Sequence, residues 1–206
     1  MKTLPSLPLI KGICCLFSIV LVSTLLMSNV NAKGWYDLPY QYTLPEGINP
    51  EGITRNRFGK TFYVGSIANG SIYAFNAITG EGHYVVEGGE GRVAIGMDYD
   101  LRSGLLYVAG RPMGQVNVYN TRNGDLVAQF DVDAGERASF VNDVKVTRNG
   151  VYITDSSRPF FYRIKLTGSG KLRKNAALQA IPLTGDYSHA VLQVDARQRD
   201  KRITCS

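Results

Sequence analysis

The sequence contains little cysteine and little histidine, and this excludes several classes of site. Cys14 and Cys15 lie among the first 32 residues, so only Cys205 remains beyond them and no internal disulfide can form there. His83 and His189 have no second histidine or cysteine at ligand spacing, which argues against a zinc site. The G-x-S-x-G motif is also absent, which disfavours a serine hydrolase of the α/β type.

Long apolar runs are missing after the first 32 residues. Lys2 and Lys11 precede the apolar run Gly12–Met27, and a stretch with small residues that ends at Ala32 provides a cleavage site. This pattern predicts a signal peptide over residues 1–32, with a signal anchor as the alternative. We therefore expect a secreted protein, or one in the lumen of the secretory pathway, with no stable membrane span after cleavage. The sequon that begins at Asn69 predicts N-glycosylation there.

Dense charge of one sign is confined to the end of the chain. Removal of Lys2 and Lys11 with the signal peptide lowers the formal net charge from +6 to +4. The only dense basic cluster is Arg197–Arg202. Such a cluster can bind nucleic acid or anionic lipid. We favour a solvated basic tail and expect no nucleic-acid partner, because a secreted chain rarely meets nucleic acid.

What the sequence does contain is a repeat of about 45 residues. Three similar units begin near Pro50, Ala94 and Val141. The recurring aromatic and aliphatic positions are Tyr63, Tyr107 and Tyr152, and Phe75, Tyr119 and Ile164. Each unit contains three or four short runs with strand-like alternation, separated by Gly and Asn, and none shows a sustained helical period. A repeat of this length with about four strands is typical of a propeller blade.

The repeat predicts an all-β fold, a partial β-propeller of about three four-stranded blades over residues 33–186, followed by an irregular basic tail over residues 187–206. Propellers usually close with 4–8 blades. Three blades leave sheet edges and faces uncovered, so we expect self-association through them. The alternatives are a shortened gene product, a ring completed by a second chain, a non-propeller stack and a β-sandwich.

Two stretches resemble a known superfamily. They are "PEGI" at Pro50–Ile53 and "VNDVKVTRNGVYITDSS" at Val141–Ser157. Together with the repeat they are similar to the regucalcin/gluconolactonase, paraoxonase and strictosidine-synthase-like proteins, over residues 45–166. The resemblance implies a six-bladed propeller. Many members bind calcium or another divalent ion at one end of the central channel, and several are lactonases or related esterases.

The resemblance also implies particular ligands. Glu51 and Asn142 match two metal ligands of that superfamily, while a further Asn and Asp lie in later blades that this sequence does not match. Residues that begin the inner strands of different blades approach one another at the channel, so Glu51 and Asn142 are expected to meet there. Asp143 and Asp155 are further candidates for lining the channel. The alternatives are a solvated turn residue for Glu51 and an Asx-turn for Asn142 and Asp143.

These patterns lead to two functional hypotheses. The first is a secreted, calcium-dependent lactonase or ester hydrolase that acts on a small-molecule ester or lactone, or a truncated, inactive remnant of such an enzyme. The second is a non-catalytic propeller fragment that acts as a binding module. The absence of the later ligand positions favours the second for this chain, while the matched motifs favour the first for its relatives.

Overall fold

The computed structural model describes residues 38–185, except residues 40, 111–113 and 133–138. The expected signal peptide at residues 1–32 and the expected basic tail at residues 187–206 lie outside the described residues. All regular structure in the described part is β-strand. No helix there is long and apolar enough to cross a membrane.

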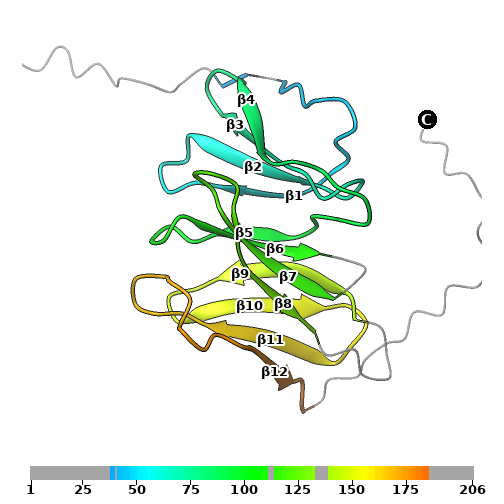
Figure 1. Ribbon diagram of the computed structural model, residues 1–206, viewed down its shortest axis with the longest axis vertical. Helices are drawn as coiled ribbons and strands as arrows, with labels where there is room; N and C mark the ends of the chain where they lie inside the picture. Colours follow the sequence, from blue (N-terminus) through cyan, green and yellow to red (C-terminus); the bar gives the residue numbers. More distant parts are fainter. Residues whose placement is uncertain (1–37, 40, 111–113, 133–138, 186–206) are drawn as a thin grey trace, which may run out of the picture. The chain divides into compact units, whose positions relative to one another are not determined.

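Within the described residues, twelve strands form three four-stranded sheets, here called blades 1, 2 and 3 (Figure 1). Blade 1 contains β1 (Pro50–Arg55), β2 (Thr61–Ser66), β3 (Ile72–Asn76) and β4 (Gly82–Val86). Blade 2 contains β5 (Met97–Tyr99), β6 (Leu105–Gly110), β7 (Gln115–Asn120) and β8 (Leu126–Asp131). Blade 3 contains β9 (Val141–Val146), β10 (Gly150–Asp155), β11 (Phe160–Lys165) and β12 (Leu178–Pro182).

Each blade is an antiparallel meander in which strands adjacent in the sequence pair with each other. The predicted turns contribute directly, because Gly80 and Gly124 both have φ of 75°, a conformation that strongly favours glycine. Along β10, Val151 and Ile153 are buried on one face and Thr154 is exposed on the other, as period-two alternation requires. The all-β class and the partial propeller of three blades are confirmed.

The blades are structurally equivalent in register as well as in sequence. Tyr63 pairs with Thr54, Tyr107 with Asp98, and Tyr152 with Lys145. The recurring tyrosine therefore occupies the same position in the second strand of every blade. Figure 1 shows the three sheets following one another along the chain, with β5 between β1 and β9.

Apolar side chains hold neighbouring blades together face to face. One cluster between blades 1 and 2 includes Ile72, Met97 and Val108. A second cluster between blades 2 and 3 includes Tyr107 and Ile153, and both of these residues are fully buried. Among the first strands, β1 contacts β5 and β5 contacts β9. The packing therefore places the starts of three inner strands side by side.

Candidate functional site

The starts of the first strands enclose a hollow of about 410 Å³, here called the axial hollow. Its lining comes from all three blades: Glu51, Gly52, Ile53, Gly96, Met97, Asn142 and Asp143. Two residues 91 positions apart in the sequence, Glu51 and Asn142, therefore line the same hollow. Asp143 lines it with them.

A β-bulge presents the polar side chains to the axial hollow in blades 1 and 3. In β1, Ile53 pairs with Val64 and Pro50 pairs with Ser66, so Glu51 and Gly52 together lie opposite one residue. In β9 the corresponding pair is Asn142 and Asp143. Bulges of this kind turn side chains out of the regular alternation and are frequent beside functional sites.

Glycine allows the inner strands to approach closely. A Cβ atom on Gly52 would overlap the carbonyl oxygen of Ile95. A Cβ atom on Gly96 would overlap the backbone of Asn142 and lie 2.6 Å from Oδ1 of Asp143. The Gly96 amide also donates a hydrogen bond to the Asn142 carbonyl oxygen at 3.0 Å. Blade 2 thus supplies a spacer without a side chain between the polar residues of blades 1 and 3.

Glu51 carries the perturbed charge of the axial hollow. Partial burial raises the pKa of its carboxyl above the usual range, and the neighbouring Asp143 carboxylate raises that pKa further. No hydrogen bond engages the Glu51 carboxylate within the described part of the chain. The two acids therefore repel each other in the absence of a cation.

Asn142 and Asp143 are held by their own blade. Nδ2 of Asn142 donates to Oγ of Ser156 at 3.2 Å, and its Oδ1 makes no hydrogen bond to any residue that the structure describes. Oδ1 of Asp143 accepts a hydrogen bond from the Val144 amide at 2.8 Å, while the Asp143 amide donates to Oγ1 of Thr154. This arrangement leaves one Asn142 oxygen and one Asp143 oxygen available to a ligand.

The donor set of the axial hollow consists of two carboxylates and one amide oxygen. These are hard oxygen ligands, which suit calcium or magnesium rather than zinc or copper. Among the described residues, no cluster of three or more His, Cys, Asp or Glu side chains could hold a metal ion. Any cation here would therefore depend on amide or water oxygens in addition to Glu51 and Asp143.

Asp155 lies elsewhere, inside blade 3, and it is not among the residues that line the axial hollow. Its carboxylate accepts hydrogen bonds from Oγ of Ser139 at 2.6 Å and from the hydroxyl of Tyr162 at 3.2 Å. It also accepts from the amides of Phe140 at 3.0 Å and Ser157 at 2.8 Å. With its side chain only 8% exposed, Asp155 ties the start of β9 to the end of β10.

A second hollow of about 670 Å³ lies where the first strands end. Asp98 of blade 2 lines this hollow and joins all three blades. Its Oδ1 accepts a hydrogen bond from Oγ1 of Thr54 at 3.3 Å, and its Oδ2 lies 3.0 Å from Nζ of Lys145. Thr54, Asp98 and Lys145 occupy the same register position in the three blades. The repeat spacing contains the signal for this row, although the sequence motifs do not mark it.

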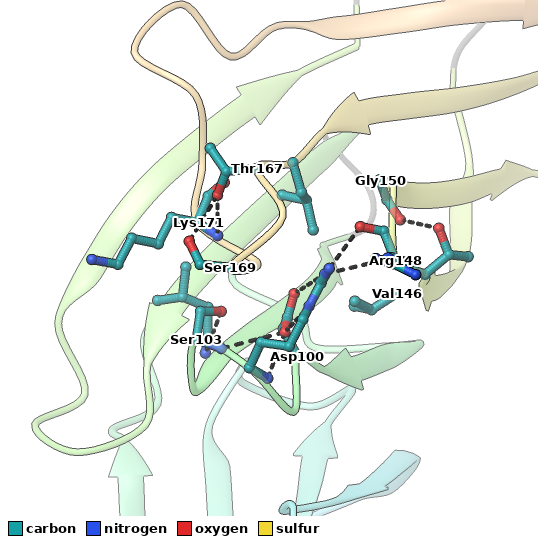
Figure 2. Close-up of polar contacts among 12 residues, drawn as sticks. Asp100, Ser103, Val146, Arg148, Gly150, Thr167, Ser169 and Lys171 are labelled. Carbon is teal, nitrogen blue, oxygen red and sulfur yellow. Dashed lines mark hydrogen bonds and ion pairs between the residues drawn. The ribbon is translucent and has the colours of Figure 1, made fainter.

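An ion pair made by the buried carboxylate of Asp100, which Figure 2 labels, supports the same end of the blades. Asp100 is fully buried, and its carboxylate contacts the Arg102 guanidinium at 2.7 and 3.0 Å. Arg102 in turn donates to the carbonyl oxygens of Thr147 and Arg148, at 3.0 and 2.6 Å. The pair therefore connects the turn after β5 in blade 2 to the turn after β9 in blade 3.

No protein-family model matches the sequence, and no curated protein matches it. Solved structures match its fold. The chain is similar to the dihydro-heme d1 dehydrogenase NirN, with a TM-score of 0.55 and 16% identity over 68% of this chain and 30% of that chain. It is also similar to a chain of the mitotic checkpoint complex, with a TM-score of 0.51 and 13% identity over 88% of this chain and 48% of that chain.

A third similar structure is the β-propeller domain of Cps50 (Swd1) from Myceliophteria thermophila. Its TM-score is 0.51, with 9% identity over 70% of this chain and 42% of that chain. Identities this low indicate a shared fold alone. The fold is that of a β-propeller, and this chain spans less than half the length of each of the three proteins.

Proposed function

We propose that the axial hollow binds a divalent cation, with calcium as the best fit, and that the protein is a secreted, gluconolactonase-like hydrolase of a small ester or lactone. The observation that carries the proposal is the shared lining of one hollow by Glu51, Asn142 and Asp143. The resemblance of "PEGI" and "VNDVKVTRNGVYITDSS" to the regucalcin/gluconolactonase superfamily supports the same assignment.

The residues fit a calcium ion in kind. Calcium takes 6–8 oxygen ligands, including carboxylates, amide oxygens and water. Glu51, Asn142 and Asp143 would supply the protein ligands, and water would complete the shell. A bound cation would also remove the repulsion between the carboxylates of Glu51 and Asp143, which otherwise raises the pKa of Glu51. Removal of this repulsion favours the binding of a cation between the two carboxylates.

A calcium ion held by Glu51, Asn142 and Asp143 would supply Lewis-acid polarisation of an ester carbonyl. The chain itself would hold its oxygen donors on paired strands, so their positions change little when substrate enters. A carboxylate would also have to accept a proton from the attacking water, and this role would fall to an oxygen of Glu51 or Asp143 that does not hold the cation. Because the donors for a cation and a proton acceptor line the same hollow, hydrolysis of a neutral ester or lactone is the reaction class that fits.

The second candidate function is a non-catalytic binding module. It is favoured by the number of donors, because the described residues supply only part of the ligand set that the superfamily resemblance implies. A partial shell can bind a cation weakly and still fail to activate a substrate. The two functions therefore separate in an activity assay rather than in a binding assay.

Calcium is expected to raise the melting temperature of the protein. With Kd of about 1 mM, typical of weak extracellular sites, 10 mM calcium contributes about 1.4 kcal/mol of stability. This corresponds to a rise of about 3–6 °C in a thermal melt followed by circular dichroism. Magnesium at the same concentration should give a smaller rise, because it demands stricter octahedral geometry. An unchanged melting temperature in calcium would contradict the cation site.

Glu51→Gln is the matched control for that titration. Because the pKa of Glu51 is raised in the folded state, protonation of its carboxyl stabilises the folded protein. This stabilisation is complete below the ordinary pKa of a glutamate carboxyl, and it is lost as pH rises through the raised pKa. Without calcium, the variant should therefore melt about 1–2 °C higher than the unmodified protein at neutral pH. With calcium, the order should reverse, and calcium stabilisation of the unmodified protein should fade as pH drops through the pKa of Glu51.

An assay of the hydrolysis of a simple γ-lactone, in which released protons are measured, distinguishes the enzyme from the binding module. If the protein is the enzyme, its rate of hydrolysis should depend on calcium and should fall at least about 100-fold in Glu51→Gln and Asn142→Ala. A protein that binds calcium in the melting experiment but hydrolyses no lactone or ester is the binding module.

The proposal also includes passage through the secretory pathway. Asn69 follows β2 in a turn, and its Oδ1 accepts a hydrogen bond from the Ser71 amide at 3.1 Å. Ser71 itself is buried. Glycosylation of Asn69 would therefore have to occur before blade 1 folds. Digestion of the secreted protein with a glycosidase should reduce its mass if the sequon is used.

A further inference from the structure

Each blade has one face that packs on the next blade, here called the forward face. Register identifies the equivalent positions, because Tyr63 pairs with Ala74, Tyr107 pairs with Val118, and Tyr152 pairs with Arg163. In blades 1 and 2 the forward face is buried against the following blade. The buried forward positions are Tyr63, Ile72 and Ala74 in blade 1 and Tyr107, Val116 and Val118 in blade 2.

The forward face of blade 3 has no following blade in the described part of the chain. Its equivalent positions are Tyr152, Phe161 and Arg163. Phe161 is 42% exposed, whereas its counterparts Ile72 and Val116 are completely buried. Nε of Arg163 is buried without a hydrogen-bond partner, although its guanidinium also donates to Gln179 at 2.9 Å. An aromatic side chain thus lies uncovered where the other two blades bury an apolar one.

The opposite, or rear, face of blade 1 is built to receive a blade. Blade 2 receives blade 1 with Met97 and Val108, which pair with each other across β5 and β6. The equivalent pair in blade 1 is Ile53 and Val64. These two residues, with Pro50 and Phe75, line an apolar hollow of about 290 Å³ that Tyr42 and Leu44 border. Tyr42 already packs on Phe75, and Val64 and Phe75 are buried, so Ile53, at 59% exposed, is the part of this surface that remains open to a second copy.

We propose that two copies of this chain associate head to tail, with the forward face of blade 3 in one copy packed on the rear face of blade 1 in the other. The occupant is a second copy because the chain carries both halves of an interface that it already forms twice internally. Counted over the described residues, two copies supply six sheets, within the 4–8 that close a propeller, whereas three copies would supply nine. The interface joins unlike surfaces, and closure at two copies prevents an open-ended chain.

Such a ring places two axial hollows around one channel, so a second Glu51 and a second Asn142 would face the first pair. The association goes beyond the cation proposal and does not depend on it. Its test is therefore carried out in a chelator, where a failure of calcium binding has no influence on the result.

The first measurement is the mass of the purified protein in solution by light scattering coupled to size exclusion. We expect twice the chain mass. Phe161→Lys on the forward face and Ile53→Lys on the rear face should each halve that mass, because each buries a charge in both interfaces of the ring. Val127→Lys is the matched control, since Val127 is 48% exposed on β8 of the middle blade, and it should leave the mass unchanged.

Mixing the two single-mass variants tests the head-to-tail arrangement. The Ile53→Lys chain keeps an intact forward face and the Phe161→Lys chain keeps an intact rear face, so an equal mixture should regain the doubled mass through one unmodified interface. An unmodified protein with the mass of one chain would overturn the proposal, whether or not the variants fold. A doubled mass that Ile53→Lys does not change, or a mixture that stays at single mass, would overturn the head-to-tail interface.

Discussion

Replacing Asp155 with alanine is expected to lower the free energy of unfolding by about 3–5 kcal/mol. The carboxylate is buried and accepts four hydrogen bonds, two of them from the amides of Phe140 and Ser157. Alanine removes the acceptor of the Ser157 amide and of the Tyr162 hydroxyl. Urea denaturation in the absence of calcium measures the loss, which should appear as a lower midpoint with an unchanged slope.

Asp155→Asn should lose about half as much, because the amide oxygen retains part of the acceptor capacity. Asp131→Ala is the control, since Asp131 is an exposed acid on β8, and its effect should stay within about 0.5 kcal/mol. A residue that served only to line the channel could be replaced at little cost to stability. An Asp155→Ala protein as stable as the unmodified one would therefore contradict the role of Asp155 as a buried acceptor.

Replacing Asp100 with alanine should lower the free energy of unfolding by about 2–3 kcal/mol, because its Arg102 partner is partly exposed and water can hydrate the unpaired guanidinium. The loss should include looser docking of blade 3, since Arg102 also donates to the carbonyl oxygens of Thr147 and Arg148. Amide hydrogen exchange is expected to accelerate in the turn between β9 and β10 in this variant.

A double-mutant cycle isolates the pair. Asp100→Ala with Arg102→Met should be less destabilised than the sum of the two single variants, because the second replacement removes the charge that the first leaves unpaired. Additive losses would show that Asp100 acts mainly by accepting hydrogen bonds from the Arg102 and Ser103 amides, at 2.8 and 3.3 Å, rather than through the ion pair.

The repeat in the sequence was sufficient to predict the fold. The recurring tyrosines and the Gly turns at matching places specify short strands of equal length, and the structure arranges them as three four-stranded blades. The same spacing predicted that Glu51 and Asn142 approach each other, and both line the axial hollow. That they bind a metal ion stays a prediction.

The sequence could not assign the role of Asp155. It follows a strand in a motif with polar neighbours, and that pattern fits both a channel residue and a buried acceptor. The outcome depends on the bulge in β9, which turns Asn142 and Asp143 to the axial hollow while Asp155 pairs opposite Val141 inside the blade. A bulge changes the alternation by one residue, and a single sequence carries no clear mark of it.

The row formed by Thr54, Asp98 and Lys145 was also missed, for a different reason. Its members have different chemistries, so no motif recurs, and only the register of the three blades places them at one level. The forward face of blade 3 is similar, because Phe161 and Arg163 differ from their aliphatic counterparts in the other blades. Strand register therefore carries information that residue type alone does not.

The side-chain amide signal of Asn142 in a nitrogen–proton correlation spectrum tests the central claim most directly. If the inner strands of blades 1 and 3 bring their oxygens to one cation, calcium should shift this signal in the unmodified protein and should not shift it in Glu51→Gln. The side-chain amide of Asn175, exposed on the segment before β12, should not move in either protein. An Asn142 signal that stays fixed at saturating calcium in a folded protein would contradict the shared cation site.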